Sequence, residues 1–289
     1  MDLDLTPVFY QLFVGLYRAS IYWLIASGLT IIFGVLRVVN FSQAVLLVLG
    51  GYMTYTFYNL TGSFWLSVAM ASISIGLVGV AIERALLKPL YRVDVTYQLL
   101  MTFAVSLILN DAMKILWGKL PISVPLPSTL AVGIGIFGRT YPLYMILVIA
   151  IGFAVYIAVL MLINRTMWGL RVRATWRRPE IAESLGINTS NIYTAVFFLG
   201  CVIAGLGGGL VIAFSPVVPG LGDFLIVSAF IVTVIAGLGN LSGAYIASIL
   251  IGVSESIFTL YLPEIDLLLI YLIMAISLMI RPQGIFGER

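Results

Sequence analysis

Histidine is absent from this chain of 289 residues, and cysteine occurs once, at Cys201. Without histidine the chain lacks the commonest general base, and with it any Ser–His pair or histidine metal ligand. A lone cysteine forms no disulfide within the chain, and its apolar surroundings indicate a small packing residue. The sequence also contains no GxxxxGK[ST] stretch, which argues against ATP binding through a P-loop.

Charge is scarce as well. Charged residues make up 9% of the chain, whereas 62% of the residues are hydrophobic. So few charges could not cover the surface of a soluble protein of this length. Apolar stretches of about 20 residues, the length that crosses a bilayer as a helix, recur along the whole sequence. We therefore predict an all-α polytopic membrane protein with a single transmembrane domain over residues 1–289.

The apolar stretches predict nine helices, two of which are short for a complete span. We expect about 8–9 transmembrane or partly spanning helices. Their predicted ranges are 8–33, 41–60, 64–82, 97–117, 141–163, 191–214, 224–238, 242–262 and 266–280.

Basic residues are distributed unevenly between the connections. Eleven of the 15 Lys and Arg residues fall in the connections 34–40, 83–96 and 164–190 or near the C-terminus. Because an excess of Lys and Arg marks the cytoplasmic side, we predict an external N-terminus and a cytoplasmic C-terminus. The acidic start MDLDLTP lacks the basic region of a secretory signal, so we expect no cleaved leader.

An island of charge, RVRATWRRPEIAESLGIN at 171–188, lies in the connection 164–190. It predicts a two-turn helix that begins at Pro179 and stops at Gly186. Its apolar residues Ile181, Ala182 and Leu185 would share one face. The hydroxyl of Thr189 or Ser190 would cap the next segment. Since so short a helix is unstable alone in water, it needs support from anionic lipid headgroups or from a cytoplasmic partner.

The order Glu180-x-Ala182-x-x-x-Gly186 resembles the EAA---G loop of ABC-importer permeases, although Ile181 stands where the motif has alanine. In that family the loop is a coupling helix that seats in a groove of the ATPase subunit. Three further stretches resemble the permease subunits of branched-chain amino acid ABC importers, whose close relatives carry urea and short amides. They are GLTIIFGVLRVVNFSQAVLLVLGGYM (28–53), AGLGNLSGAYIASILIGVSES (236–256) and RPQGIFG (281–287).

The resemblance spans nearly the whole chain, with the motifs in the family's order. It implies a non-catalytic permease of a binding-protein-dependent importer for branched-chain or other neutral amino acids, in a bacterial or archaeal plasma (inner) membrane. The implied partners are two ATP-binding subunits, a second homologous permease, an extracytoplasmic binding protein and lipid, with no nucleic acid. ATP would bind to those subunits, so no cofactor or metal is expected here. The implied coupling residues are Arg177, Arg178, Glu180, Ala182 and Gly186.

The pattern Asn-x-Ser-x-Ala occurs twice, at 40–44 and 240–244, each time at a predicted cytoplasmic end. Such a recurrence is typical of a parallel internal repeat. Asn and Ser beside glycine favour non-helical turns whose free backbone groups find side-chain partners. The turns are either simple connections or an inner gate, with Asn40, Gln43 and Asn240 as its candidate residues. Gln43 departs from the family, which commonly has histidine there.

Ionisable residues inside membrane segments are costly and usually face a bundle interior or a wet cavity. Asp111 and Lys114 are spaced i, i+3, which favours a structural ion pair with each other. Arg18 and Glu255 are predicted to be partners, either as an internal salt bridge or beside the path of a zwitterionic substrate. Glu255 matches the amino acid branch of the family, whereas Arg18 replaces a usually apolar residue.

Small residues recur along segment 191–214, at Gly200, Ala204 and Gly208. Such spacing allows helices to approach closely in lipid, so we interpret it as a packing face. Two other classes of function are weighed against a transporter subunit. An intramembrane protease would need either a histidine beside its serine or two facing aspartates, and this chain has no histidine and only one aspartate in the interior of a predicted segment. A secondary transporter or channel has no use for a coupling helix.

Overall fold

The fold is known from a computed structural model that describes residues 6–91, 93–136, 139–261 and 265–287. Within these ranges it contains eleven α-helices and one antiparallel hairpin of strands β1 (Gly133–Ile136) and β2 (Arg139–Pro142). The helices are α1 (Thr6–Leu36), α2 (Gln43–Thr61), α3 (Phe64–Ile82), α4 (Val95–Trp117), α5 (Leu143–Arg165), α6 (Met167–Arg177), α7 (Pro179–Ser184), α8 (Thr189–Val211), α9 (Leu221–Ala236), α10 (Leu241–Tyr261) and α11 (Asp266–Ile280).

All nine apolar segments predicted from the sequence are helical, so the all-α polytopic class is confirmed. In the described part of the chain, six helices are long and apolar enough to cross a bilayer. α9 and α11 are shorter apolar helices. The exact number of complete spans therefore stays a prediction.

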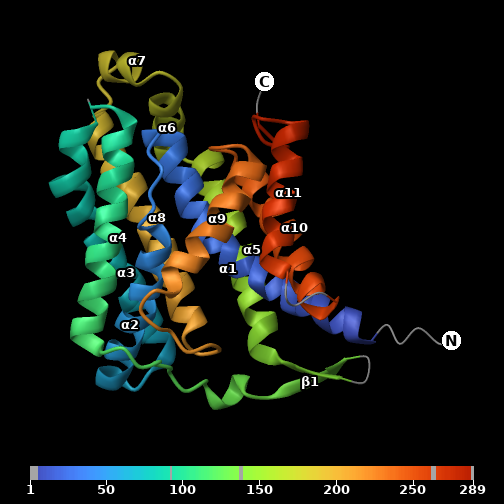
Figure 1. Cartoon of the computed structure of the whole chain (residues 1–289). Coiled ribbons are helices and arrows are strands. Elements are labelled where there is room, and N and C mark those ends of the chain that lie inside the picture. Colours follow the sequence, from blue (N-terminus) through green and yellow to red (C-terminus); the bar gives the residue numbers. More distant parts are fainter. Residues whose placement is uncertain (1–5, 92, 137–138, 262–264, 288–289) are drawn as a thin grey trace.

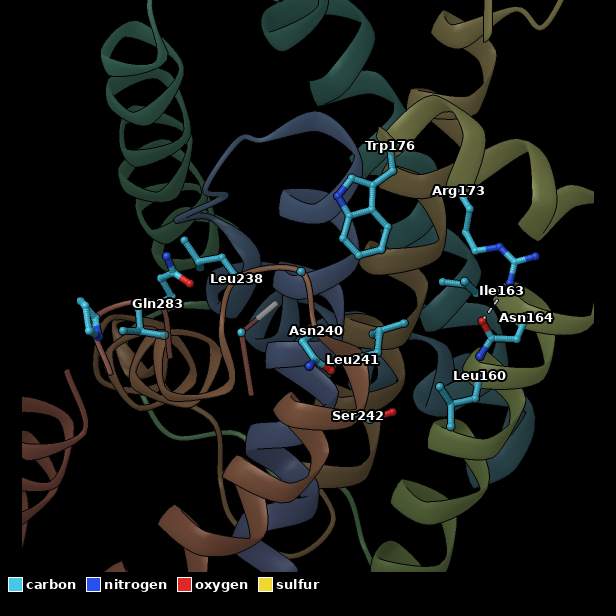
Figure 2. Close-up of a pocket in the computed structure, with 14 residues that line it drawn as sticks. Leu160, Ile163, Asn164, Arg173, Trp176, Leu238, Asn240, Leu241, Ser242 and Gln283 are labelled. Atoms are coloured by element: carbon cyan, nitrogen blue, oxygen red, sulfur yellow. Dashed lines mark hydrogen bonds between the residues drawn. The ribbon is translucent and has the colours of Figure 1, made fainter. Parts of the chain in front are cut away.

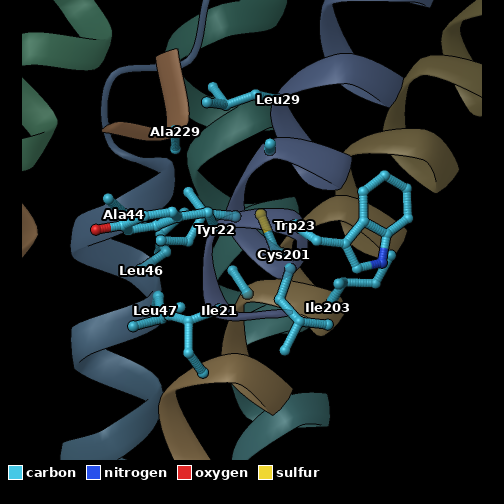
Figure 3. Packing of buried hydrophobic residues seen from close by; sticks show 14 of the residues in the cluster. Ile21, Tyr22, Trp23, Leu29, Ala44, Leu46, Leu47, Cys201, Ile203 and Ala229 are labelled. Carbon is cyan, nitrogen blue, oxygen red and sulfur yellow. The ribbon is translucent and has the colours of Figure 1, made fainter. Parts of the chain in front are cut away.

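α8 lies at the centre of the bundle, packed against α1, α2 and α3 (Figure 1). Its glycines let neighbouring backbones approach: a Cβ on Gly208 would lie 1.8 Å from the carbonyl oxygen of Leu47. The packing face expected along this helix is confirmed. Cys201 is fully buried within the apolar cluster, against Gly79 of α3, as a packing residue should be (Figure 3).

The outer helices turn apolar surface outward. Only 28% of the most apolar 18-residue stretch of α4 is buried, and only 22% of the corresponding stretch of α5. α4 exposes Phe103, Leu107 and Ile108. A monomeric soluble protein rarely carries a contiguous apolar surface of this extent. Hydrocarbon is the environment in which such a face has no cost.

The connection between α1 and α2 runs from the end of α1 back into the bundle. α1 has 31 residues, so it is roughly 46 Å long, more than the hydrocarbon core of about 30 Å, and it runs obliquely (Figure 1). Gln43, the first residue of α2, is fully buried and faces Gly28 of α1. Gly28 lies two turns before the end of α1 at Leu36, so α2 begins roughly 12 Å below that end.

Three local features differ from the sequence-based prediction. The connection 164–190 was expected to hold one two-turn helix, but Met167–Arg177 forms a second, longer helix, α6. The sequence did not indicate this helix, because arginines alternate with its periodic apolar residues. The cap of α8 is Asn188, whose side chain accepts from Asn191 N, rather than Thr189 or Ser190. The hairpin β1–β2 was not expected, and its second strand takes the start of segment 141–163.

The two ends of the bundle differ in character. α6 and α7 lie at one end, together with the last turn of α11, and the β1–β2 hairpin lies at the other (Figure 1). α4 begins at the α6–α7 end, where the Asp94 carboxylate caps it by accepting from Thr96 N at 2.8 Å. Hydrogen bonding from the Thr96 side chain and, less strongly, from the Thr96 backbone lowers the pKa of Asp94 from its ordinary value.

Candidate functional site

An ion pair between two helices lies where α1 crosses α10. Two glycines bring these helices together, because a Cβ on Gly15 would lie 2.7 Å from Val253 Cα and one on Gly252 would lie 2.5 Å from Ala19 N. This close approach sets a guanidinium on one helix beside a carboxylate on the other. Small residues at such a crossing are what lipid-embedded helices need for close packing.

Arg18 and Glu255 form the ion pair predicted from the sequence, with Nη1 and Oε1 3.1 Å apart. The Tyr22 hydroxyl donates to the other carboxylate oxygen at 2.6 Å, and Arg18 also donates to Thr259 Oγ1 at 3.3 Å. The side chains are 32% and 15% exposed, so the pair lies at the edge of the packed interior. The position of this pair beside a substrate path stays a prediction.

Asp111 and Lys114 form the second predicted ion pair, 2.8 Å apart. Both side chains are well exposed, at 71% and 40%, on the outer surface of α4. Their neighbour Asn110 points the other way, donating to Asp223 and accepting from Gly220 N near the start of α9. The pair is thus a surface contact, and it lies apart from the α1–α10 crossing.

Asn40 and Gln43 are fully buried, and their side chains form a hydrogen bond with each other. Asn40 Oδ1 also accepts from Ser42, and Gln43 Nε2 donates to the carbonyl of Gly200 in α8 at 2.8 Å. These bonds satisfy the turn that begins α2 and fasten it to the central helix. The glutamine therefore fills a defined polar position in place of the family's histidine.

Asn240 holds the corresponding turn before α10. Its side-chain oxygen accepts from Gly243 N at 2.9 Å, and its amide donates to the carbonyl of Phe286 at 2.6 Å. The turn is thereby tied to the C-terminal segment 281–287. Unlike Asn40, Asn240 is half-buried and borders a cavity of about 460 Å³. The two Asn-x-Ser-x-Ala turns therefore share a local role but not an environment.

The predicted two-turn helix is present as α7, and it ends in a Schellman motif. Gly186 adopts φ +82°, its N–H donates to the carbonyl of Glu183, and Ile187 N donates to that of Ala182. Ala182 is 2% exposed, while Ile181 and Leu185 are 47% and 75% exposed. The apolar face of α7 is therefore only partly used within the chain.

α7 is joined to the bundle by its link to α8. The Thr189 hydroxyl donates to the Glu183 carboxylate. One turn further on, Thr194 donates at 2.8 Å to Glu83, a fully buried residue in the π-helical turn after α3. Tyr91 donates to the same carboxylate at 2.5 Å. Hydrogen bonds thus tie α7 to the first turn of α8, and the next turn of α8 to α3.

Sequence reasoning missed Trp176, whose side chain brings α6 into contact with two other elements. A Cβ on Gly239 would lie 3.0 Å from the Trp176 ring and one on Gly34 would lie 3.7 Å from it. The indole thus packs against the end of α1 and the turn before α10. An amphipathic reading of 167–177 would have signalled this inward face.

The residues singled out in the sequence occupy separate places. Arg18 and Glu255 lie together at the α1–α10 crossing, and Asn40 and Gln43 lie together beside α8. Asn240 lies at the C-terminal segment. The predicted coupling residues are on or beside α7, with Arg177, Arg178 and Glu180 exposed. No group of three potential metal ligands occurs among the described residues.

Apolar helices that surround a buried glycine-rich helix and an internal ion pair define a multi-pass membrane protein. The chain matches the family described as branched-chain amino acid transport system / permease component over residues 11–278, and it belongs to that family. It is therefore a transport permease of the plasma membrane.

Individual relatives agree with this assignment. The probable branched-chain amino acid transport permease protein LivH of Methanocaldococcus jannaschii is 30% identical over 279 residues, covering 91% of this chain and 88% of that protein. The high-affinity branched-chain amino acid transport system permease proteins BraD of Pseudomonas aeruginosa and LivH of Escherichia coli K12 are 25% and 24% identical, each covering 96% of this chain and 95% of the relative. No solved structure matches the chain.

Proposed function

We propose that this chain is the permease subunit of a binding-protein-dependent ABC importer whose cargo is a branched-chain or other neutral amino acid. One observation carries the proposal: α7 projects at one end of the bundle with Ile181 and Leu185 largely unburied. Two apolar side chains on a two-turn helix fit a groove of a partner protein. The cargo is suggested by the names of the relatives and by the zwitterion-compatible ion pair.

The α6–α7 end is the cytoplasmic end in this proposal. It carries an excess of arginine, and exposed Arg171, Arg177 and Arg178 lie on or next to α6. Arg92 and Arg289, which also supported this orientation, lie outside the described residues, as does the start of the chain. ATP-driven closure of the partner subunits would push on α7, and the bonds from Glu183 to Thr189 and from Thr194 to Glu83 would pass the movement to α8 and α3.

The assembly would contain two ATP-binding subunits, a second homologous permease and an extracytoplasmic binding protein. This chain would contribute one transmembrane domain over residues 1–289, and the second permease would supply the other half of the pathway. Asn240, which borders a cavity at the α6–α7 end, is the gate candidate nearest to that pathway. Asn40 and Gln43 would act indirectly, by holding α2 on α8.

Glu255 and Arg18 are proposed to lie beside the translocation path. A carboxylate at the edge of the packed interior attracts an ammonium group, whereas urea and short amides carry no such group. The assay uses proteoliposomes with the ATPase subunits, internal ATP and excess binding protein. Wild type should take up leucine in preference to acetamide, and Glu255→Gln should slow leucine uptake about 10-fold, the loss expected for one charged hydrogen bond.

Asp111→Asn is the matched control, because it also neutralises a carboxylate paired with a basic residue. It should leave leucine uptake near the wild-type rate. If Glu255 has only a structural role, the exchanged pair Arg18→Glu/Glu255→Arg should restore uptake along with stability. ATP-driven uptake of acetamide or urea in place of leucine would overturn the cargo while keeping the importer.

A further inference from the structure

A cavity of about 460 Å³ lies beneath α6, between α5 on one side and the α9–α10 turn and C-terminal segment on the other (Figure 2). Its size is in the range of sites for small molecules, which are roughly 300–1,000 Å³. Arg173 and Trp176 of α6 face Asn240 and Ser242 at the start of α10 across it, with Gln283 at the far side.

Among the described residues that line the cavity, Arg173 is the one that carries a charge. Its Nη1 donates to Asn164 Oδ1 at 3.1 Å, a neutral partner. The ion pairs between described side chains are Arg18–Glu255 and Lys114–Asp111, and neither includes Arg173. A guanidinium that has no carboxylate partner among the described residues and borders an open cavity is a ready partner for an anionic ligand, because its fork of N–H groups matches a carboxylate.

The remaining lining divides by chemistry. Asn240 and Ser242 add neutral polar groups, while Leu160, Ile163 and Leu241 form an aliphatic wall. A few polar groups that fix orientation within a mostly apolar lining are usual for small-molecule sites. The combination suits a compact molecule with one carboxylate and an aliphatic body. A phosphate ester would leave the apolar wall without a partner, and a cationic ligand would leave the guanidinium without one.

We infer that this cavity binds a small aliphatic carboxylate, with Arg173 on the carboxylate and the leucine and isoleucine side chains around the body. An occupant would bridge α6, which leads into α7, and the turn before α10. Those elements already meet at the Trp176–Gly239 contact, and an occupant would brace them further. If the chain is the importer subunit proposed above, cargo accumulating at this end would slow its own uptake.

Binding is measured on the full chain in lipid nanodiscs, without ATPase or binding protein, with radiolabelled leucine as probe. Wild type should bind leucine, and 4-methylpentanoate should displace it because it keeps the carboxylate and the aliphatic body. Leucinamide, which lacks the carboxylate, should not displace it. Arg173→Gln should weaken binding at least about 10-fold. Arg171→Gln is the matched control on the same helix, outside the lining, and should bind as wild type does.

Regulation is measured separately, as the initial rate of uptake into proteoliposomes preloaded with 4-methylpentanoate. Preloading should slow wild type and Arg171→Gln but not Arg173→Gln. Equal loss of binding in both arginine variants, or displacement by leucinamide as strong as by 4-methylpentanoate, would overturn the site. Binding that depends on Arg173 in a chain that supports no ATP-driven uptake would keep the site and refute the importer. Uptake without any leucine binding in nanodiscs would do the reverse.

Discussion

Leu185→Asp should abolish ATP-driven uptake while leaving the chain folded and inserted. Leu185 is 75% exposed, so the change removes little packing within the chain, and surface substitutions of this kind usually alter stability by less than about 0.5 kcal/mol. On a docked α7 the same change would bury an unpaired carboxylate in an apolar groove. Loss of a central interface contact costs about 2 kcal/mol or more, which corresponds to roughly 30-fold weaker docking.

The measurement is co-purification of a P-loop ATPase with a tagged permease, followed by uptake in proteoliposomes. Leu120→Asp is the matched control, because Leu120 is 78% exposed and lies in the connection after α4, at the end opposite α7. It should retain the ATPase. Normal ATPase recovery with Leu185→Asp would leave α7 without a docking role, and recovery of no ATPase with wild type would favour a secondary transporter or channel.

Gly208→Ala should prevent the bundle from packing. The added Cβ would lie 1.8 Å from the Leu47 carbonyl oxygen and 2.7 Å from Gly51 N, both backbone atoms that cannot rotate away. α2 and α8 would have to separate at the centre of the molecule. Overpacking a core by one methyl group typically costs about 1–3 kcal/mol, and a clash with backbone belongs at the upper end of that range or beyond.

Cys201 reports the result directly. It is the one cysteine in the chain and is fully buried, so a thiol-reactive fluorophore labels it only when the bundle opens. Gly208→Ala should lower the temperature of labelling by many degrees or leave no folded protein to isolate. Gly34→Ala, whose Cβ would meet its nearest atom at 3.5 Å, should label near the wild-type temperature. Equal midpoints for the two variants would contradict the packing assigned to α8.

Several features follow from the sequence because their causes are local or compositional. Apolar runs of bilayer length predict helices wherever they occur, since lipid offers no other partner for backbone N–H and C=O groups. α7 was predicted from Pro179 at its start and Gly186 at its end, and the left-handed glycine confirms the stop. The ion pair of Asp111 and Lys114 follows from their spacing on one helix turn.

The pairing of Arg18 with Glu255 was also predicted, from the cost of an unpaired charge in hydrocarbon. Its geometry was beyond the sequence, because it depends on Gly15 and Gly252 meeting at a crossing of two distant helices. Family resemblance supplied the permease class. It did not show that Gln43 bonds to α8 or that Asn240 bonds to the C-terminal segment.

The sequence by itself determined which segments are helices, which of them are apolar enough for lipid, and where the short helix after Pro179 begins and ends. Those properties depend on residues within a few turns of one another. The tertiary structure alone decided that α8 is central, that Trp176 rests on Gly34 and Gly239, and that Arg173 faces a cavity. Each of these depends on contacts between residues far apart in the chain, where close packing allows only particular pairs of surfaces to meet.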